Sequence, residues 1–238
     1  MESRIKLGDI TVDVVRKSIK NIHLSVYPPT GSVRISAPKR LSLDNIRVFA
    51  LSKLGWIKKQ QKKVRDQERE TRREYIDRES HYLWGERYLL KIEEVNKPPC
   101  ITLKHRKMIL CVRPGAALDK KQDVVAEWYR DQVKVALPDL IAKWERIMGV
   151  TVHGCTVRKM KTRWGSCSPA SGKIRINTEL VRKPPECLEY ILVHEMAHLI
   201  EPSHNRRFIA LMDQYVPKWK LYKDELNHLP VRHEEWEY

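Results

Sequence analysis

The sequence lacks several features by which common classes of protein are recognised. No run approaches the roughly 18 apolar residues of a transmembrane helix. The opening MESRIKLGDITVDVVRK has neither the apolar stretch nor the small-residue cleavage site of a secretory signal. No segment is repeated along the 238 residues. We therefore expect a cytoplasmic protein that has no membrane partner.

Cysteine and phenylalanine are also scarce. Five cysteines are scattered along the chain without a CxxC pair, which is a poor framework for disulfides and for a cysteine-ligated zinc site. We expect them to be reduced and to serve as small apolar residues. Only two Phe stand against seven Trp and nine Tyr, so most aromatic side chains carry a polar atom that suits partly hydrated sites.

Positive charge, by contrast, is in excess. Lys and Arg number 46 against 30 Asp and Glu, which gives a formal net charge of +16. An excess of this size favours association with polyanions, and nucleic acid is the first candidate. The alternative is a well-hydrated surface without such a partner, and charge alone does not separate the two.

Residues 1–116 are predicted to form a β-rich region that contains one long charged helix. Alternating segments rich in β-branched residues occur at 10–15, 21–27 and 32–37. They indicate two or three antiparallel strands with a hairpin. Ser42 then provides an N-cap for a helix with an apolar stripe.

The predicted helix covers about residues 42–78 and loses its apolar face after Val64. The remainder carries charges of both signs. We interpret it as an exposed helical extension with i,i+4 ion pairs. A basic arm over residues 58–73 that contacts nucleic acid is the alternative. Two more hairpins are expected, over 82–95 and 100–113.

Residues 117–238 are predicted to form the catalytic core. A periodic apolar pattern over 118–148 indicates a long helix, which Pro138 can kink or divide. Strands are expected at 151–158 and 173–177, with a loop between them.

Another helix is expected to begin at Pro184–Pro185, because proline suits the first turn of a helix. Pro202 ends it. A last helix over about 204–214 follows, with Ser203 as its N-cap. The tail from His228 onward is expected to be a flexible end.

The segment HEMAHLIEPSH contains the strongest functional signal. His194 and His198 are four residues apart, so their imidazoles project from one face of a helix and can bind one metal ion. His204 follows just past Pro202, and a chain that turns back can supply the third protein ligand that a catalytic zinc needs. Glu195 can reach the reacting water without binding the ion. The pattern predicts a Zn2+-dependent hydrolase.

Several segments together resemble one known family. They are RWGSCS (163–168), KIRIN (173–177), EYILVHEMAHL (189–199), the His204–Asn205 pair, Phe208 and Pro217. On these residues the sequence resembles the YgjP-like zinc metallopeptidases, with SprT-like and minigluzincin-type zincins as more distant relatives. The match is dense over 158–217 and looser elsewhere.

The resemblance implies a fold, a metal site and an activity. The fold is α+β, with a zincin-like core made of a small, mostly antiparallel sheet, an active-site helix and a backing helix. Zinc would be bound by His194, His198 and His204, with Glu195 as general base, in an intracellular metallopeptidase that acts on a peptide or protein substrate. The resemblance does not identify that substrate or an oligomeric state.

One related group is disfavoured by the turn after the helix. The spacing of the three histidines equals that of the metzincin motif HExxHxxGxxH. Metzincins place glycine where this chain has Glu201, because the backbone turns sharply there. Glu201–Pro202 cannot turn in the same way, so we do not assign the chain to the metzincins.

Substrate contacts are predicted by analogy with zincins, in which the strand before the active-site helix lines the cleft. Residues 173–177 would then form an edge strand that pairs with an extended peptide. We predict Trp164, Ser166 and Asn177 as substrate-binding residues, with a role in the core or the sheet as the alternative. Tyr190 and Tyr215 are candidate hydrogen-bond donors to the transition state, with packing in the core as the alternative for both.

Two other functions stay open. The protein could be a nucleic-acid-associated zinc protease, or an accessory protein that acts on DNA-bound proteins, because of its charge. It could also be a zinc-binding module without catalysis, which a fourth protein ligand would favour. Glu195 argues against the second alternative, because a purely structural site needs no general base.

Overall fold

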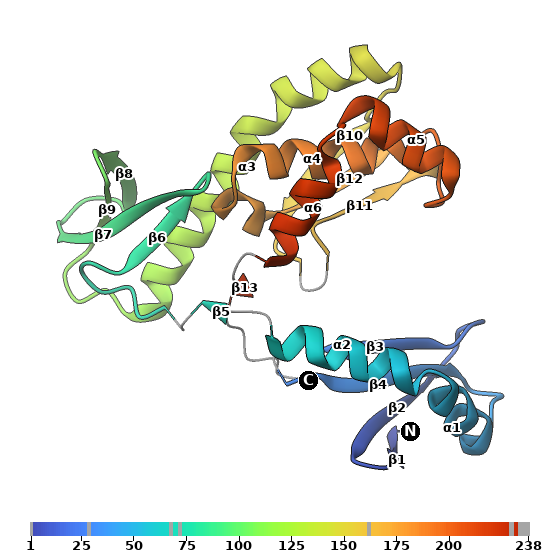
Figure 1. Ribbon diagram of the computed structural model, residues 1–238. Coiled ribbons are helices and arrows are strands. Elements are labelled where there is room, and N and C mark those ends of the chain that lie inside the picture. Colours follow the sequence, from blue (N-terminus) through green and yellow to red (C-terminus); the bar gives the residue numbers. More distant parts are fainter. Residues whose placement is uncertain are drawn as a thin grey trace. The chain divides into compact units, whose positions relative to one another are not determined.

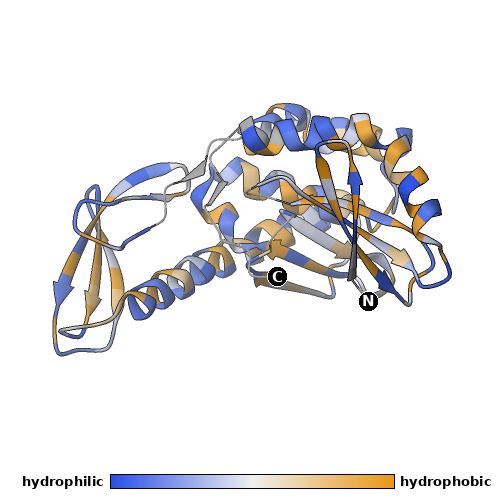
Figure 2. Cartoon of the chain, turned by 90° about the horizontal axis from the view of Figure 1, so that it is seen from below, coloured by the Kyte–Doolittle hydropathy of each residue, from blue (hydrophilic) through white to orange (hydrophobic). Residues whose placement is uncertain are grey.

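In the computed structural model the chain divides into two compact units. One unit comprises residues 1–72 with 228–238, and the other comprises residues 73–227. The structure describes residues 2–27, 30–66, 69–70, 73–160, 163–228 and 231–232. Each unit has its own hydrophobic core. Figure 1 shows the elements of both units along the chain, and hydrophobic and hydrophilic residues are interleaved along their helices and strands (Figure 2).

The first unit contains a four-stranded sheet in the order β1-β2-β4-β3. Its strands are β1 (Glu2–Leu7), β2 (Ile10–Lys17), β3 (His23–Tyr27) and β4 (Ser32–Pro38). The predicted β3–β4 hairpin is confirmed, but β2 and β4 pair in parallel. Strand β1 was not predicted. Its residues Ile5 and Leu7 are buried, and it pairs with β2 across a tight turn at Gly8 (φ 60°).

Helices α1 (Leu43–Ser52) and α2 (Leu54–Asp66) complete this unit. Ser42 caps α1 as predicted, accepting a hydrogen bond from the Asn45 amide. The predicted continuous helix to residue 78 is wrong, because α2 ends at Asp66 and residues 73–79 are not helical. Beyond Val64 the next apolar side chain is Tyr75, which is buried in the second unit at a positive φ of 53°. Helical backbone cannot adopt that conformation. β5 (Arg69–Glu70) pairs with β13 (Val231–Arg232).

The second unit begins with a sheet in the order β6-β7-β9-β8. The strands are β6 (Ser80–Leu83), β7 (Glu86–Glu94), β8 (Cys100–Lys104) and β9 (Lys107–Val112). Both predicted hairpins are present. Helix α3 (Leu118–Met148) runs through Pro138 without interruption. Its buried residues share one core with Leu90 and Leu110 of the sheet, so the predicted boundary at 116/117 falls inside this unit.

The rest of the second unit forms the surroundings of the histidine motif. A three-stranded sheet has the order β10-β12-β11, with β10 (Gly154–Arg158), β11 (Gly165–Ser168) and β12 (Lys173–Asn177). β12 pairs in parallel with β10 and antiparallel with β11. Short 3-10 turns follow β11 and β12, at Pro169–Ser171 and Thr178–Arg182. The helices are α4 (Pro185–Ala197), α5 (Arg206–Tyr215) and α6 (Trp219–His228).

Two local predictions in this region are corrected, and one helix is new. Part of the predicted loop before residue 173 is strand β11. The N-cap of α5 is Asn205 and not Ser203, because the Asn205 amide oxygen accepts from the Phe208 backbone. Helix α6 was not predicted; it packs Leu226 into the core. In the described part of the chain, no helix is long and apolar enough to cross a membrane.

Candidate metal centre

Helix α4 carries the predicted ligand His194, and the predicted ligand His198 is its C-cap residue. Pro184 and Pro185 start it, and Glu186 in its first turn faces the positive end of the helix dipole. The helix is buried nearly all round, including Leu188, Leu192 and Val193. Such burial fixes the helix on all sides and therefore fixes the position from which His194 projects.

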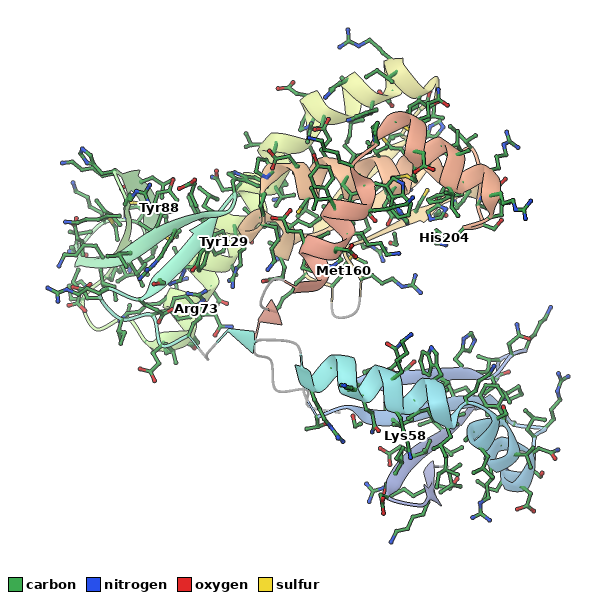
Figure 3. All side chains as sticks on the ribbon, viewed as in Figure 1. Lys58, Arg73, Tyr88, Tyr129, Met160 and His204 are labelled. Carbon is green, nitrogen blue, oxygen red and sulfur yellow. The ribbon has the colours of Figure 1, made fainter. Side chains whose placement is uncertain are left out.

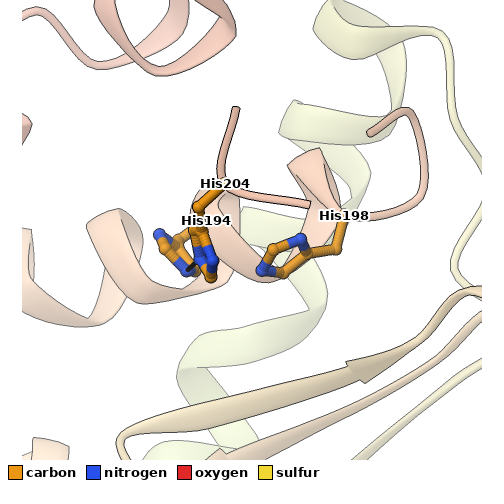
Figure 4. Close-up of side chains that lie close together, drawn as sticks. All are labelled: His194, His198 and His204. Carbon is orange, nitrogen blue, oxygen red and sulfur yellow. Dashed lines mark hydrogen bonds between the residues drawn. The ribbon is translucent and has the colours of Figure 1, made fainter. Parts of the chain in front are cut away.

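The three histidines meet at one point (Figure 4). One ring nitrogen from each of His194, His198 and His204 lies within 4.8 Å of the others. The Nε2 atoms of His194 and His204 are 3.1 Å apart. Two nitrogens on a tetrahedral zinc are separated by roughly 3.3 Å, given Zn–N bonds of about 2.0–2.1 Å. The donor set and its spacing therefore fit a zinc ion.

The protonation states also suit metal binding. Burial lowers the pKa of His194 to about 4, with the neighbouring His198 and His204 acting in the same direction. The ring is therefore neutral at pH 7, with a nitrogen lone pair available. Nδ1 of His198 lies 3.2 Å from the backbone carbonyl of Glu201. A carbonyl only accepts, so Nδ1 donates and Nε2 is left unprotonated for a metal.

Phe208 packs against all three imidazoles. Its ring stacks on His198 at 4.7 Å between centroids and meets His194 and His204 edge-on at 4.9 Å and 4.7 Å. Phe208 is buried and lies on α5. Phe208 is not itself a ligand, but its contacts fix the orientation of the three rings. Its spacing of four residues from His204 is the only local signal in the sequence for this role.

The turn between α4 and α5 is held by side chains in place of a glycine. The Glu201 carboxylate accepts from the backbone amide of Ser203 at 3.3 Å and from its hydroxyl at 2.9 Å. These two bonds, the hydroxyl first, lower the pKa of Glu201. Asn205 then caps α5. The chain returns to His194 without the glycine that the metzincin pattern requires.

Glu195 lies beside the histidines and against strand β11. It is 6% exposed, and burial raises its pKa to about 7, an effect that the positive charge of Arg163 partly offsets. A carboxylate with such a pKa can both take up and release a proton near neutral pH. A Cβ placed on Gly165 would lie 2.7 Å from Oε1 of Glu195, so the absence of a side chain at Gly165 makes room for this carboxylate.

A cavity of about 520 Å3 adjoins the three histidines and Glu195. Trp164 and Ser166, two of the predicted substrate-binding residues, line it. Tyr190 also lines it, whereas Tyr215 lines a different cavity beside Trp144. Burial, followed by the charge of Glu195, raises the pKa of Tyr190 to about 12, so its hydroxyl keeps its proton. The cavity is therefore open to the motif and bordered by one tyrosine hydrogen-bond donor.

Asn177 does not line this cavity, although we predicted it as a substrate contact. Its side-chain nitrogen donates to the carbonyls of Met160 and Arg163 at 2.9 Å and 2.8 Å. Its oxygen accepts from the amides of Met160 and Glu179 at 3.2 Å and 3.1 Å. All of its hydrogen-bonding capacity is thus used to fix the chain on either side of β12.

The predicted edge strand is also corrected. Residues 173–177 form β12, which is paired on both sides by β10 and β11. A central strand has no free backbone groups for an added peptide. The edge next to α4 is β11, whose Gly165 contacts Glu195.

The sequence model of the family described as "YgjP-like, metallopeptidase domain" matches residues 20–229. The chain belongs to the YgjP-like metallopeptidase family. The match extends over parts of both structural units of this YgjP-like protein. It includes the whole of the segment that carries the histidines. A search of curated proteins found no match.

Two solved structures are similar to part of this YgjP-like chain. One is the metallopeptidase zymogen abylysin of Pyrococcus abyssi, at 25% identity and a TM-score of 0.35, covering 37% of this chain and 89% of that one. The other is the metallopeptidase zymogen jannalysin of Methanocaldococcus jannaschii, at 20% identity and a TM-score of 0.33, covering 37% and 90%.

Proposed function

We propose that this YgjP-like protein is a zinc-dependent peptidase with His194, His198 and His204 as metal ligands and Glu195 as general base. The observation that carries the proposal is the meeting of three imidazoles beside a buried carboxylate at a cavity. Zinc, when bound there, supplies a Lewis acid that polarises a peptide carbonyl and lowers the pKa of water to about 7.

The protein's own groups would handle the proton and the charge. Glu195 takes the proton of the attacking water and passes it to the leaving amine, a task suited to its raised pKa of about 7. Tyr190 lines the same cavity and keeps its hydroxyl proton, so it can donate to the developing oxyanion. Trp164 and Ser166 border the space that a peptide would enter.

A catalytic site is supported over a structural zinc module. Among the described residues, the cluster that could hold an ion contains the three histidines and no fourth His, Cys, Asp or Glu. A structural zinc is normally held by four protein ligands, whereas a catalytic one keeps a position open.

The activity is tested by a proteome-wide cleavage profile of the wild type against Glu195→Gln. The amide of glutamine is similar in size and cannot accept the proton, so we expect the wild-type cleavages to disappear in the variant. Treatment of the wild type with a chelator should remove the same cleavages. Cleavages that persist in Glu195→Gln at the wild-type rate would exclude Glu195 as the general base.

A further inference from the structure

Positive charge is concentrated in the segment that carries α1 and α2. Residues 31–65 contain ten Lys and Arg and a single acidic residue, Asp44. Over residues 1–72, 17 basic side chains stand against 7 acidic ones. Less than a third of the chain therefore carries +10 of the net charge of +16.

The described cations of α1 and α2, together with Lys53 between the two helices, are exposed and unpaired. Those whose side chains the structure describes are Arg47, Lys53, Lys58, Lys59, Lys62 and Arg65, which we name the helical basic face. In the described part of the chain, none of the six forms an ion pair. Lys58 lies on α2 in Figure 3. On α3, by contrast, Arg130 pairs with Glu127 at 2.6 Å and Lys134 with Asp131 at 2.9 Å.

Like charges are adjacent along α2. Lys58 and Lys62 are four residues apart, and Lys62 and Arg65 are three apart. Like charges at these spacings repel and destabilise a helix. Most of the ion-paired extension that was expected beyond Val64 lies outside the described side chains. A polyanion bound along the helix would remove this repulsion, so the charge pattern matches such a partner.

The apolar residues of α2 argue against a membrane as that partner. Ile57 is buried in the core of the first unit, and Leu54 packs against the same core. Trp56 is 43% exposed, one turn from both Lys53 and Lys59. A helix that lies in a membrane surface needs a free apolar face, whereas α2 exposes cations and one tryptophan. Helix α1 exposes three large apolar residues, Leu43, Val48 and Leu51, whereas among the described residues of α2 the exposed large apolar residue is Trp56.

We propose that the helical basic face binds the phosphodiester backbone of nucleic acid without reading its sequence. Lysine and arginine contact phosphates, which carry no base code. Trp56 adds an aromatic face on which any base can stack. The proposal concerns the first unit and does not depend on the peptidase activity.

The test measures binding of the full chain to labelled duplex DNA, duplex RNA and single-stranded DNA by fluorescence anisotropy. We expect affinity to fall steeply between about 50 mM and about 200 mM salt, because bound phosphates release counterions. In the variant Lys58→Glu/Lys59→Glu/Lys62→Glu, affinity at the lower salt should drop by at least about tenfold. The slope of log affinity against log salt should become shallower by about 2–3.

The matched control is Lys104→Glu/Lys107→Glu/Lys120→Glu. These lysines are exposed in the second unit, and the control has the same net charge as the test variant. It should keep the wild-type affinity within about twofold. Equal losses in the two variants would overturn the proposal, because net charge and not this face would then set the affinity.

Two further arms make the outcome decisive. The variant Lys58→Gln/Lys59→Gln/Lys62→Gln keeps the helix propensity of α2. It should show an intermediate loss of affinity, and it replaces the Glu variant if that variant does not fold. Vesicles with anionic phosphatidylserine should bind more weakly than duplex. Binding to vesicles but not to any nucleic acid, or no salt-dependent binding at all, would overturn the proposal. The DNA and RNA arms identify which backbone is preferred.

Discussion

At the scale of single residues, the residues of the metal centre could be predicted from the sequence, whereas the residue that makes room for Glu195 could not. His194, Glu195, His198 and His204 lie within eleven residues, so helical spacing for the first three and a turn at Pro202 for His204 predict that they share a site. Gly165 reaches the site from another strand and is in contact with Glu195. Contacts between distant segments depend on how the sheet and the helix pack, and local patterns in the sequence do not show this packing.

Replacement of Gly165 by alanine should reduce peptidase activity by about 10²-fold, because a Cβ there would displace the Glu195 carboxylate. Zinc content should stay at the wild-type level, since Gly165 touches no histidine among its three nearest contacts. The rate of cleavage of a peptide that the wild type cleaves measures the first effect. Elemental analysis of the bound metal measures the second.

The matched control is Gly154→Ala, in the same sheet. A Cβ on Gly154 meets only the Lys173 side chain, at 3.9 Å. This variant should retain wild-type activity. A fully active Gly165→Ala enzyme would refute the positioning role of Gly165.

At the scale of elements, local patterns were predicted best. The helix over 118–148, the hairpins and the proline start of α4 follow from periodicity and turn residues. Strand β11 was missed because its residues, GSCS, have little β propensity. The strand is formed through its antiparallel pairing with β12 and not through the β propensity of its own residues. The end of α2 at Asp66 was missed because the charged run that follows contains no Gly or Pro to mark it.

Removal of the α5 cap tests the turn that returns His204 to the centre. Asn205→Ala deletes the acceptor for the Phe208 amide and should lower the free energy of unfolding by about 1 kcal/mol. Asn205→Asp keeps an acceptor and should restore most of it. Thermal melts of the two variants measure the difference, and equal destabilisation by Ala and Asp would show that capping is not the cause.

The turn before β6 gives a pH-dependent prediction. Burial raises the pKa of Glu79, but hydrogen bonds and charge from His81, together with the amides of Glu74 and Tyr75, outweigh it and lower the pKa to about 2. A lowered carboxyl pKa stabilises the fold above the unfolded value of about 4.5, and this is lost as pH falls toward about 2. Wild type should therefore be more stable than Glu79→Gln at pH 6.

Denaturant unfolding at several pH values measures this difference in stability. It should shrink steadily as the pH falls from about 4.5 to about 2. A difference that is constant over this range would mean that the charge of Glu79 does not stabilise the turn.

At the scale of the whole molecule, two separate cores suggest two separable activities. The core of the first unit contains Val12, Ile35 and Ile57, and that of the second contains the residues around α4. Composition alone predicted the excess of positive charge. Its location on α1 and α2 became clear only from the bounds of α2 and the exposure of its lysines in the structure.

The two proposed activities should therefore respond to different substitutions. The Lys58→Glu/Lys59→Glu/Lys62→Glu variant should cleave a short peptide at the wild-type rate, and Glu195→Gln should bind duplex with wild-type affinity. Peptidase assays and anisotropy on the same two proteins provide the comparison. Loss of peptide cleavage in the lysine variant, with its fold intact by circular dichroism, would show that the activities are coupled.

The most direct test of the central claim is the zinc content of purified full-length protein and its histidine variants, determined by elemental analysis. We predict one zinc per chain in the wild type and in Glu195→Gln, and little or none in His198→Ala and His204→Ala. His105→Asn, in a turn with a φ of 53° that asparagine tolerates, is the control and should keep its zinc. Full zinc retention by His198→Ala or His204→Ala would contradict the assignment of the metal centre.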